Sequence, residues 1–325
     1  MKKYLSLMLC ISILLYGCAE KEATYTPKDV KSIVVDMDSA VLNMDMTSII
    51  DTSWYKIVPL ETSPQSLVGG KIKGLYYRDG KIYVYDTQTE TITMFDDDGK
   101  FIAKIKDRGE GPHEYLGMSD VRFTDDAIYV YDLNGRKILQ YDKDCRYVKT
   151  IFIKDVLKNV FQPNNVFVVG DRVYMVDYML DEAKIKYGDP HKVCAMDMES
   201  DSVVYTKYLP YDISTAPSYQ FYLKGQKYSV NGNGEVHFMC GKTDTIYAAT
   251  KDDVCPAYVL DFGDKALPVS MMREVSARDI RSNPQYEKFV WDVQKLWDLE
   301  DYIVVEIFYS GKVPKQSLLK LKEVK

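Results

Sequence analysis

The chain is poor in the residues that mark catalytic and metal centres. Only three of its 325 residues are histidines, and these lie far apart without the spacing of metal ligands. No H-E-x-x-H, G-x-S-x-G or phosphate-loop pattern occurs, and no two cysteines form a C-x-x-C pair. We therefore expect no metal and no cofactor. After the first 18 residues four cysteines remain, either as buried free thiols or with one disulfide between the last two: Cys145, Cys194, Cys240 and Cys255.

Basic and flexible residues are also scarce. The formal net charge is −6 and becomes about −8 without Lys2 and Lys3, so the chain does not suit nucleic acid, whose phosphates need basic patches. The 12 prolines and 18 glycines are too few for a disordered or fibrous protein. Hydrophobic residues make up 46% of the chain and tyrosines number 27, which suits a packed core of strands. These values predict a globular protein without a nucleic-acid partner.

The first 18 residues are expected to be a signal peptide rather than part of the fold. Two lysines precede an apolar run over residues 5–15, which is too short to span a bilayer with ease. Leu15 to Cys18 (L-Y-G-C) resembles a bacterial lipobox, which implies acylation of Cys18 and a membrane contact through a lipid anchor. A plain secretory signal is the alternative. Residues 19–31 are expected to form a polar tether, and their start, A-E-K-E, resembles the export signals of surface lipoproteins of Bacteroidetes.

The strongest pattern in the sequence is a repeat with a period of 46 residues. The segment from Gly80 to Ile105 aligns without a gap with the segment from Asp126 to Ile151, and both contain I-Y-V-Y-D. A self-match at a fixed period is typical of repeat architectures. Each copy consists of short strands separated by turn residues such as D-G, and four such strands are typical of one propeller blade. The sequence thus predicts an all-β chain folded as a β-propeller over residues 32–325.

The expected strands extend beyond the two clear copies. Looser copies are expected over residues 166–209 and 227–262, and a short helical or irregular insertion near 270–297. An early strand within residues 49–61 is expected to complete the last blade. The best-defined strand predictions are Lys81–Asp86, Thr91–Asp96, Thr245–Ala249 and Tyr302–Tyr309.

Several short stretches, in order, resemble one family. The stretch from Asp107 to Phe123 followed by I-Y-V-Y-D looks like the NHL-type repeat. The chain is more closely similar to the six-bladed β-propeller lipoproteins of Bacteroides and relatives, through V-P-L-E-T (58–62), G-E-G-P-H-E-Y (109–115), T-D-T-I-Y (243–247) and Y-V-L-D-F-G (258–263). The resemblance implies six blades and a place in the outer membrane, with or without exposure on the cell surface. Four clear units and a partial fifth leave five blades, or an incomplete sixth, as alternatives.

Strand direction predicts where a ligand would bind. Strands alternate within a blade, so the link between its second and third strands lies on the same face as the link to the next blade. Ligand sites of propellers usually gather on that face, around the axis. The candidate ligand-binding residues on that face are Asp86, Asp132, Asp177, Asn134, Arg136, Arg108, His113 and Glu114.

Structural roles are the alternative for these residues. Asp86 and Asp132 end strands and would cap turns, while Glu114 would bind amides of its own loop. His113 stands out because histidine titrates near neutral pH. We expect an exported, lipid-anchored binding or scaffolding protein of the cell envelope, with a glycan, a peptide or a partner protein as ligand. A hydrolase or lyase that acts on a glycan in the axial funnel is the alternative, since the fold does not decide between them.

Overall fold

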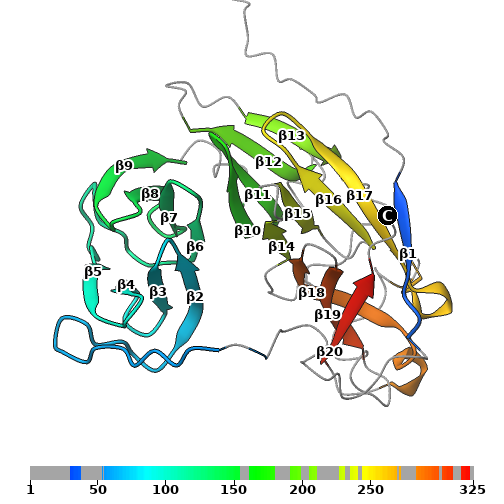
Figure 1. Cartoon of the computed structure of the whole chain (residues 1–325). Helices are drawn as coiled ribbons and strands as arrows, with labels where there is room; N and C mark the ends of the chain where they lie inside the picture. Colours follow the sequence, from blue (N-terminus) through cyan, green and yellow to red (C-terminus); the bar gives the residue numbers. More distant parts are fainter. Residues whose placement is uncertain are drawn as a thin grey trace, which may run out of the picture.

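A computed structural model shows a fold made of strands (Figure 1). Within the part of the chain that it describes, the strands form five sheets, and the numbered helices are two short 3-10 helices. The signal peptide, Cys18 and most of the tether lie outside this part. The described residues are 30–37, 53, 55–153, 161–179, 191–198, 205–210, 227–230, 235–240, 244–268, 271, 283–299, 302–309 and 316–322.

The first two sheets are copies of one another. Their strands pair in chain order, all antiparallel. Tyr83 pairs with Tyr76 and Met94, and Tyr129 pairs at matching places with Arg122 and Gln140. The repeat read from the sequence is therefore confirmed down to its register. The first sheet is β2 (Ile72–Arg78), β3 (Lys81–Asp86), β4 (Thr91–Asp96) and β5 (Phe101–Ile105), and the second is β6 (Asp120–Phe123), β7 (Ala127–Asp132), β8 (Lys137–Asp142) and β9 (Tyr147–Phe152).

Both copies of the repeat have an aspartate just before the turn that joins their last two strands, and its hydrogen bonds explain why. The Oδ1 atom of Asp96 accepts hydrogen bonds from the backbone N–H groups of Asp98 (3.0 Å) and Lys100 (2.8 Å). The Oδ1 atom of Asp142 accepts the corresponding bonds from Asp144 and Arg146, both at 2.8 Å. A side chain that bonds to the backbone two residues ahead fixes a turn. The same hydrogen bonds thus close the β4–β5 and β8–β9 hairpins.

The three remaining sheets follow the same order of strands. The fourth gains an extra strand, β1, on its outer edge, parallel to β17. The third sheet is β10 (Phe161–Val169), β11 (Arg172–Met179), β12 (His191–Asp197) and β13 (Tyr205–Pro210). The fourth is β14 (Tyr228–Val230), β15 (Val236–Met239), β16 (Thr245–Ala249), β17 (Val254–Asp261) and β1 (Lys31–Val34), and the fifth is β18 (Val290–Asp298), β19 (Tyr302–Tyr309) and β20 (Gln316–Lys322).

Two expectations about the ends of the domain need correction. The strand expected within residues 49–61 is absent from its described part, since residues 55–61 form no strand, and residues 49–52 and 54 lie outside the described part. The early strand that does join a later sheet is β1, which pairs with β17 of the fourth sheet. The insertion expected near residues 270–297 contains the 3-10 helix η4 (Pro284–Tyr286), but its last third is β18. A second 3-10 helix, η3, covers Gly263–Lys265.

The five sheets stand in an arc with β2, β6, β10, β14 and β18 innermost (Figure 1). Apolar side chains fill each interface between successive sheets: first and second around Tyr85, second and third around Tyr129, third and fourth around Phe167, and fourth and fifth around Leu260. Among the described residues no apolar cluster joins the fifth sheet to the first. The architecture is a β-propeller. The second, third and fourth sheets each have a neighbour on both sides, so both of their faces are buried. The apolar residues on both faces of β3 predict such packing for a blade.

The four cysteines of the domain are free thiols in the structure. Burial raises the pKa of the thiols of Cys145 and Cys194 to about 12. Because the thiolate is the reactive form, these two residues are chemically inert at neutral pH. Of the two alternatives that the sequence left open for Cys240 and Cys255, the structure has buried free thiols rather than a disulfide.

Candidate functional site

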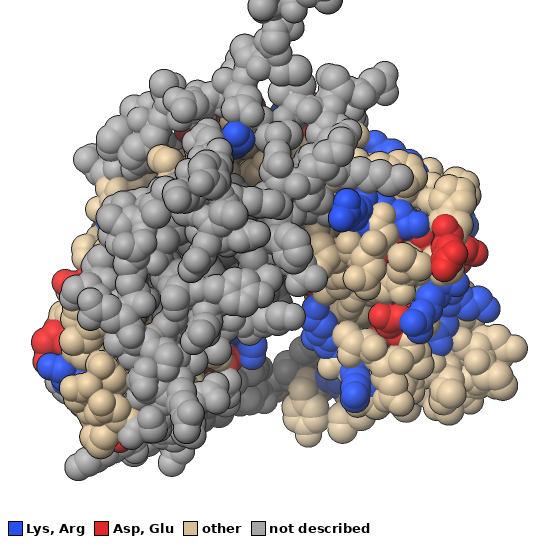
Figure 2. Space-filling view, turned by 180° about the vertical axis from the view of Figure 1, so that it is seen from behind, with Lys and Arg blue, Asp and Glu red and all other residues tan. Residues whose placement is uncertain are grey.

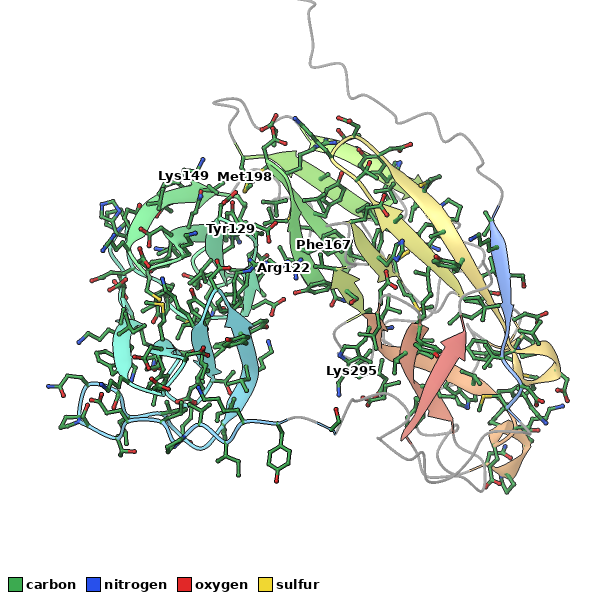
Figure 3. All side chains as sticks on the ribbon, in the orientation of Figure 1. Arg122, Tyr129, Lys149, Phe167, Met198 and Lys295 are labelled. Carbon is green, nitrogen blue, oxygen red and sulfur yellow. The ribbon has the colours of Figure 1, made fainter. Side chains whose placement is uncertain are left out.

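Polar and charged side chains lie on or beside the inner strands, at the centre of the arc. Figure 3 places Arg122 of β6 and Lys295 of β18 on opposite sides of this centre. Seen from behind, the surface is hollowed beside the first two sheets, with lysine and arginine side chains along that rim (Figure 2). Two sets of residues are distinguished below: the Asp120 group (Lys73, Tyr76, Asp120, Arg122 and Tyr228) and the Lys227 group (Asn165, Lys227 and Asp292).

The Asp120 group connects three sheets through one carboxylate. The Oδ1 atom of Asp120 lies 3.4 Å from the Nζ atom of Lys73 on β2, and its Oδ2 atom accepts a hydrogen bond of 3.2 Å from the hydroxyl of Tyr228 on β14. Burial, and then the charge of Asp120, raise the pKa of Tyr228, so its hydroxyl remains a neutral donor. The side chains of Lys73 and Asp120 retain 48% and 30% of their exposure. Solvent, and therefore a ligand, can reach this group.

Arg122 is the unusual member of the Asp120 group. Among the described residues its guanidinium makes no hydrogen bond and no ion pair, and its Nε atom is buried. Its Cζ atom lies 5.7 Å from the centre of the Tyr228 ring. Burial lowers the pKa of Arg122, although nearby tyrosines and Asp120 act in the opposite direction. Arginine does not lose its proton in proteins, so a positive charge stands here without a bonded anion.

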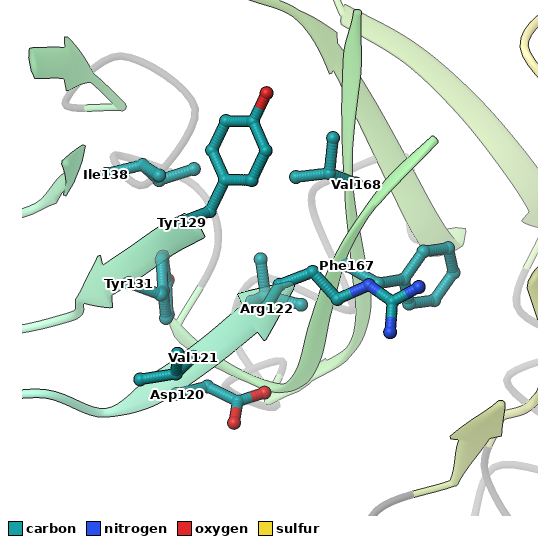
Figure 4. A pocket seen from close by; sticks show the side chains of 9 residues that line it. Asp120, Val121, Arg122, Tyr129, Tyr131, Ile138, Phe167 and Val168 are labelled. Atoms are coloured by element: carbon teal, nitrogen blue, oxygen red, sulfur yellow. The ribbon is translucent and has the colours of Figure 1, made fainter. Parts of the chain in front are cut away.

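Arg122 also borders a small cavity between the second and third sheets (Figure 4). The cavity has a volume of about 10 Å³, which is room for about one water molecule. Figure 4 shows the Arg122 side chain extended from β6 toward Phe167 of β10, away from Ile138 and Tyr129. The hydroxyl of Tyr131, another residue of the cavity wall, is buried without a hydrogen-bond partner in the described part of the chain. The cavity is too small to enclose a substrate, so a ligand of Arg122 would approach from the axis.

The Lys227 group is a buried ion pair between the fourth and fifth sheets. The Nζ atom of Lys227 lies 2.6 Å from the Oδ1 atom of Asp292, and the two side chains are 5% and 2% exposed. Asn165 of β10 accepts a hydrogen bond of 3.2 Å from the backbone N–H of Lys227 through its Oδ1 atom. Buried charges are paired or hydrogen-bonded because an isolated charge is costly in the interior. Because Tyr228 follows Lys227 in the chain, the ion pair also holds in place the backbone that carries Tyr228, a member of the Asp120 group.

Two of the predicted site residues, Asp86 and Asp132, prove to hold the backbone of their own sheets. Both are 0% exposed. The Asp86 carboxylate accepts hydrogen bonds from Thr89 Oγ1 (2.5 Å), Gly69 N–H (2.7 Å) and Gln88 N–H (2.8 Å). The Asp132 carboxylate accepts corresponding bonds from Leu116 N–H (2.8 Å) and Gly135 N–H (2.9 Å). Each aspartate thus joins the turn after its strand to the segment that enters its sheet, which is the structural alternative considered for them.

The loop before β6 lies on the predicted face. Arg108 Nη1 lies 3.2 Å from the Oε2 atom of Glu90 in the β3–β4 turn, and Gly111 accepts a hydrogen bond of 3.0 Å from Lys137 Nζ at the start of β8. Glu114 accepts a hydrogen bond of 2.9 Å from Gly111 N–H and so closes its own loop. His113 is exposed, with its ring centre 4.5 Å from that of Tyr147. Arg108 and His113 therefore remain accessible, whereas Glu114 is occupied within the loop.

The other predicted residues lie apart from the axial groups. Asn134 and Arg136 are exposed in the turn between β7 and β8, and Arg136 has a left-handed backbone with φ of 50°. Glu90, at the corresponding place in the first copy, has φ of 52°. Asp177 lies in β11, and its side chain is outside the described part. The left-handed conformation at Arg136 is thus shared by both copies, which indicates that this position shapes the turn.

Sequence reasoning missed the axial residues. Arg122 occupies in the second copy the place of Tyr76 in the first, opposite Tyr129 and Tyr83 respectively. This replacement of an aromatic residue by a charged one between the two copies could have indicated a functional role for Arg122. No such sign exists for Lys227 and Asp292, which are 65 positions apart and meet only in the folded chain.

The described residues contain no group of three or more histidine, cysteine, aspartate or glutamate side chains arranged to hold a metal ion. They also contain no helix long and apolar enough to cross a membrane.

The comparisons with known proteins agree with the fold. The sequence profile of the family described as "Domain of unknown function (DUF4934)" matches residues 32–316. No curated protein matches the chain. A Bacteroides fragilis protein assigned as exported is similar in structure, with a TM-score of 0.59 and 14% identity over 90% of this chain and 80% of that one.

Two further structures give lower scores. A member of the DUF4221 family from Bacteroides vulgatus has a TM-score of 0.46 and 13% identity, over 80% of this chain and 76% of that one. The virginiamycin B lyase of Staphylococcus aureus has a TM-score of 0.40 and 10% identity, over 82% of this chain and 73% of that one. Of these three structures only the Bacteroides fragilis protein is similar enough to inform the fold, and at 14% identity that likeness supports the fold alone.

Proposed function

The protein belongs to the DUF4934 family, and we propose that it is a ligand-binding or scaffolding β-propeller of the cell envelope rather than an enzyme. The observation that carries the proposal is the Asp120 group, in which donors and an acceptor from three sheets converge at the axis. Binding sites typically contain a few such convergent polar groups. The cavity beside Arg122 is too small to enclose a reacting substrate, and the partly exposed side chains of Lys73 and Asp120 offer an accessible polar surface, which favours binding over catalysis.

Binding to an array of glycans, with a pull-down of envelope proteins as a second arm, tests this proposal. We expect Asp120→Asn to weaken binding, because it removes the charge that orients Lys73 and Tyr228. The loop residues Arg108 and His113 form the second candidate site, and the variant Arg108→Ala with His113→Ala tests it separately. Binding that survives Asp120→Asn but fails in the loop variant would move the site from the axis to the loop. No retained glycan or protein in either arm would contradict the binding role.

We propose that the protein is exported and anchored in the outer membrane, exposed on the cell surface, by a lipid on Cys18. The proposal is supported by the L-Y-G-C sequence after an apolar run, and by the similarity to a Bacteroides protein assigned as exported. Replacing Cys18 by alanine is expected to abolish labelling of the protein by a fatty-acid analogue, because the thiol is the acylated group. The Cys145→Ala variant, which changes a thiol of the propeller, is the control and should label as the wild type does. Labelling that persists without Cys18 would contradict the anchor.

We also propose that the ring is of the six-bladed kind with NHL-like repeats. The space of the sixth blade would lie between the fifth sheet and the first. In support, Leu75 and Tyr77 of β2 are 67% and 65% exposed, whereas apolar residues at the other sheet interfaces are buried. A sheet edge or face without a neighbour is unfavourable in water.

An enzyme is the second candidate, a hydrolase or lyase that acts on a glycan in the axial funnel. One observation favours it: the Nδ1 atom of His237 lies 2.7 Å from the Oδ2 atom of Asp298, and Ser229 Oγ accepts a hydrogen bond of 2.9 Å from the backbone N–H of Asp298. A histidine oriented by a carboxylate is typical of general-base sites. Release of shorter products from a bound glycan, lost in His237→Gln, would establish this alternative over binding.

A further inference from the structure

We infer that the ligand of the Asp120 group is a sugar acid, whose carboxylate is bound by the guanidinium of Arg122. This inference rests on the proposed binding function and specifies its ligand. The starting observation is that Arg122 has no hydrogen bond and no ion pair among the described residues, although its Nε atom is buried. A partly buried charge without a hydrogen-bonded partner is unfavourable, and proteins retain such groups where a ligand supplies the partner.

Asp120 does not fill this role within the chain. It lies two residues before Arg122 on β6, but its two oxygens are directed to Lys73 (3.4 Å) and to the Tyr228 hydroxyl (3.2 Å). The guanidinium instead extends toward Phe167, and its Cζ atom lies 5.7 Å from the centre of the Tyr228 ring (Figure 4). A guanidinium within about 6 Å of an aromatic ring is attracted to the ring and keeps its N–H groups available for a planar acceptor. A carboxylate is such an acceptor, and arginine binds it with two parallel hydrogen bonds.

The charge of the group indicates a singly charged ligand. Lys73 and Arg122 are positive and Asp120 is negative, which leaves one positive charge to be matched. A carboxylate matches it, whereas a phosphate dianion would leave an excess negative charge next to Asp120. Like charges at close range are unfavourable where water is partly excluded.

The remaining groups suit hydroxyls on the same small molecule. Asp120 accepts hydrogen bonds, Lys73 and Tyr228 donate them, and the side chains of Lys73 and Asp120 are 48% and 30% exposed. The Tyr76 and Phe123 rings stack with their centres 4.0 Å apart and so form an apolar wall in the neighbouring part of the first two sheets. A sugar acid carries a carboxylate, several hydroxyls and an apolar ring face within one ring. A peptide carboxylate lacks these hydroxyls and is the alternative outcome.

A matched pair of ligands tests the inference by calorimetric titration. The probe is an oligosaccharide of uronic acids, and its control is the same oligosaccharide with the carboxyl groups reduced to alcohols. We expect the wild type to prefer the acidic form by about 10- to 100-fold, the range for hydrogen bonds to a charged group. In Arg122→Met this preference should disappear, and in Arg122→Lys it should be reduced, because an ammonium does not form the bidentate contact.

The variants should fold, because Arg122 makes no hydrogen bond whose loss would destabilise the described part of the chain. Their thermal midpoints and near-ultraviolet circular dichroism check this. Equal affinity of the wild type for both oligosaccharides, or an unchanged preference in Arg122→Met, would overturn the inference while leaving the binding function intact. Competition by inorganic phosphate or by a peptide carboxylate that exceeds competition by free glucuronate would also overturn it. Failure of the wild type to bind any glycan, peptide or protein would remove the proposed function itself.

Discussion

Replacing Lys227 by methionine is expected to lower the free energy of unfolding by about 3–5 kcal/mol. The ammonium of Lys227 lies 2.6 Å from Asp292, and the two side chains are only 5% and 2% exposed. Methionine has a similar length but no charge, so the carboxylate of Asp292 would be left in the interior without its cation. Most of the loss comes from this stranded charge rather than from the pair's own attraction. Urea unfolding followed by tryptophan fluorescence measures the change.

A second lysine of the chain provides the matched control. Lys295 lies 2.7 Å from Glu306, nearly the same distance, but its side chain is 46% exposed. Lys295→Met should therefore lower the free energy of unfolding by less than about 1 kcal/mol, the range for exposed ion pairs. The double variant Lys227→Met with Asp292→Leu should recover part of the loss, since it leaves no unpaired charge. An equal and small effect of Lys227→Met and Lys295→Met would show that the buried pair does not stabilise the junction of the fourth and fifth sheets.

The second large effect is expected at Asp86, whose replacement by alanine should lower the free energy of unfolding by about 2–4 kcal/mol. The carboxylate is 0% exposed and accepts three hydrogen bonds, from Gly69, Gln88 and Thr89. Alanine leaves these part-buried donors without their acceptor, which is more unfavourable than losing a hydrogen bond at the surface. Asp132→Ala, at the corresponding place in the second sheet, should have a similar effect. Asp96→Ala is the control, because its two backbone donors lie in an accessible turn.

The contribution of Asp86 should also depend on pH. Burial alone would raise the pKa of this carboxyl, but the hydrogen bonds from Thr89, Gln88 and Gly69 outweigh it and the pKa is lowered from its usual 3.8. A carboxyl whose pKa is lower in the folded than in the unfolded chain stabilises the fold at neutral pH. This stability is lost as the pH falls below about 4 and through the folded-state pKa. The difference in unfolding free energy between wild type and Asp86→Ala should therefore shrink between pH 5 and pH 2, and a constant difference would contradict the role of the charge.

The local features of the fold could be predicted from the sequence because they are encoded within one blade. The strands Lys81–Asp86, Thr91–Asp96 and Thr245–Ala249 have the predicted bounds. The turn predicted at Asp97-Asp98-Gly99 is present, and Asp96 before it bonds to the backbone two residues ahead, as Asp142 does in the second copy. The alternation of side chains and the turn residues act over fewer than ten residues, so a single sequence is sufficient to reveal them.

Features that depend on distant parts of the chain could not be predicted in the same way. The sequence predicts a helical or irregular insertion where β18 lies, because charged residues interrupt its apolar residues. The structure has a strand there, with register shifts after Val290 and after Val293. β1 joins the fourth sheet through pairing with β17, more than 200 positions away, and no local pattern specifies that partner. The contact of Asp120 with Tyr228 spans 108 positions. The candidate site thus depends on how whole sheets are arranged. From the sequence alone, only the presence of charged residues on the innermost strands could have been recognised.

The outermost strand of every sheet has a consequence for how copies of the protein approach one another. The strands β1, β5, β9, β13 and β20 are the outer edges of the five sheets. Each contains a lysine: Lys31, Lys104, Lys149, Lys207 and Lys320. Lysines on edge strands disfavour the approach of a second edge and so hinder neighbouring molecules from continuing one another's hydrogen-bond ladders. Densely packed copies of the protein would accordingly remain separate instead of assembling into fibrils.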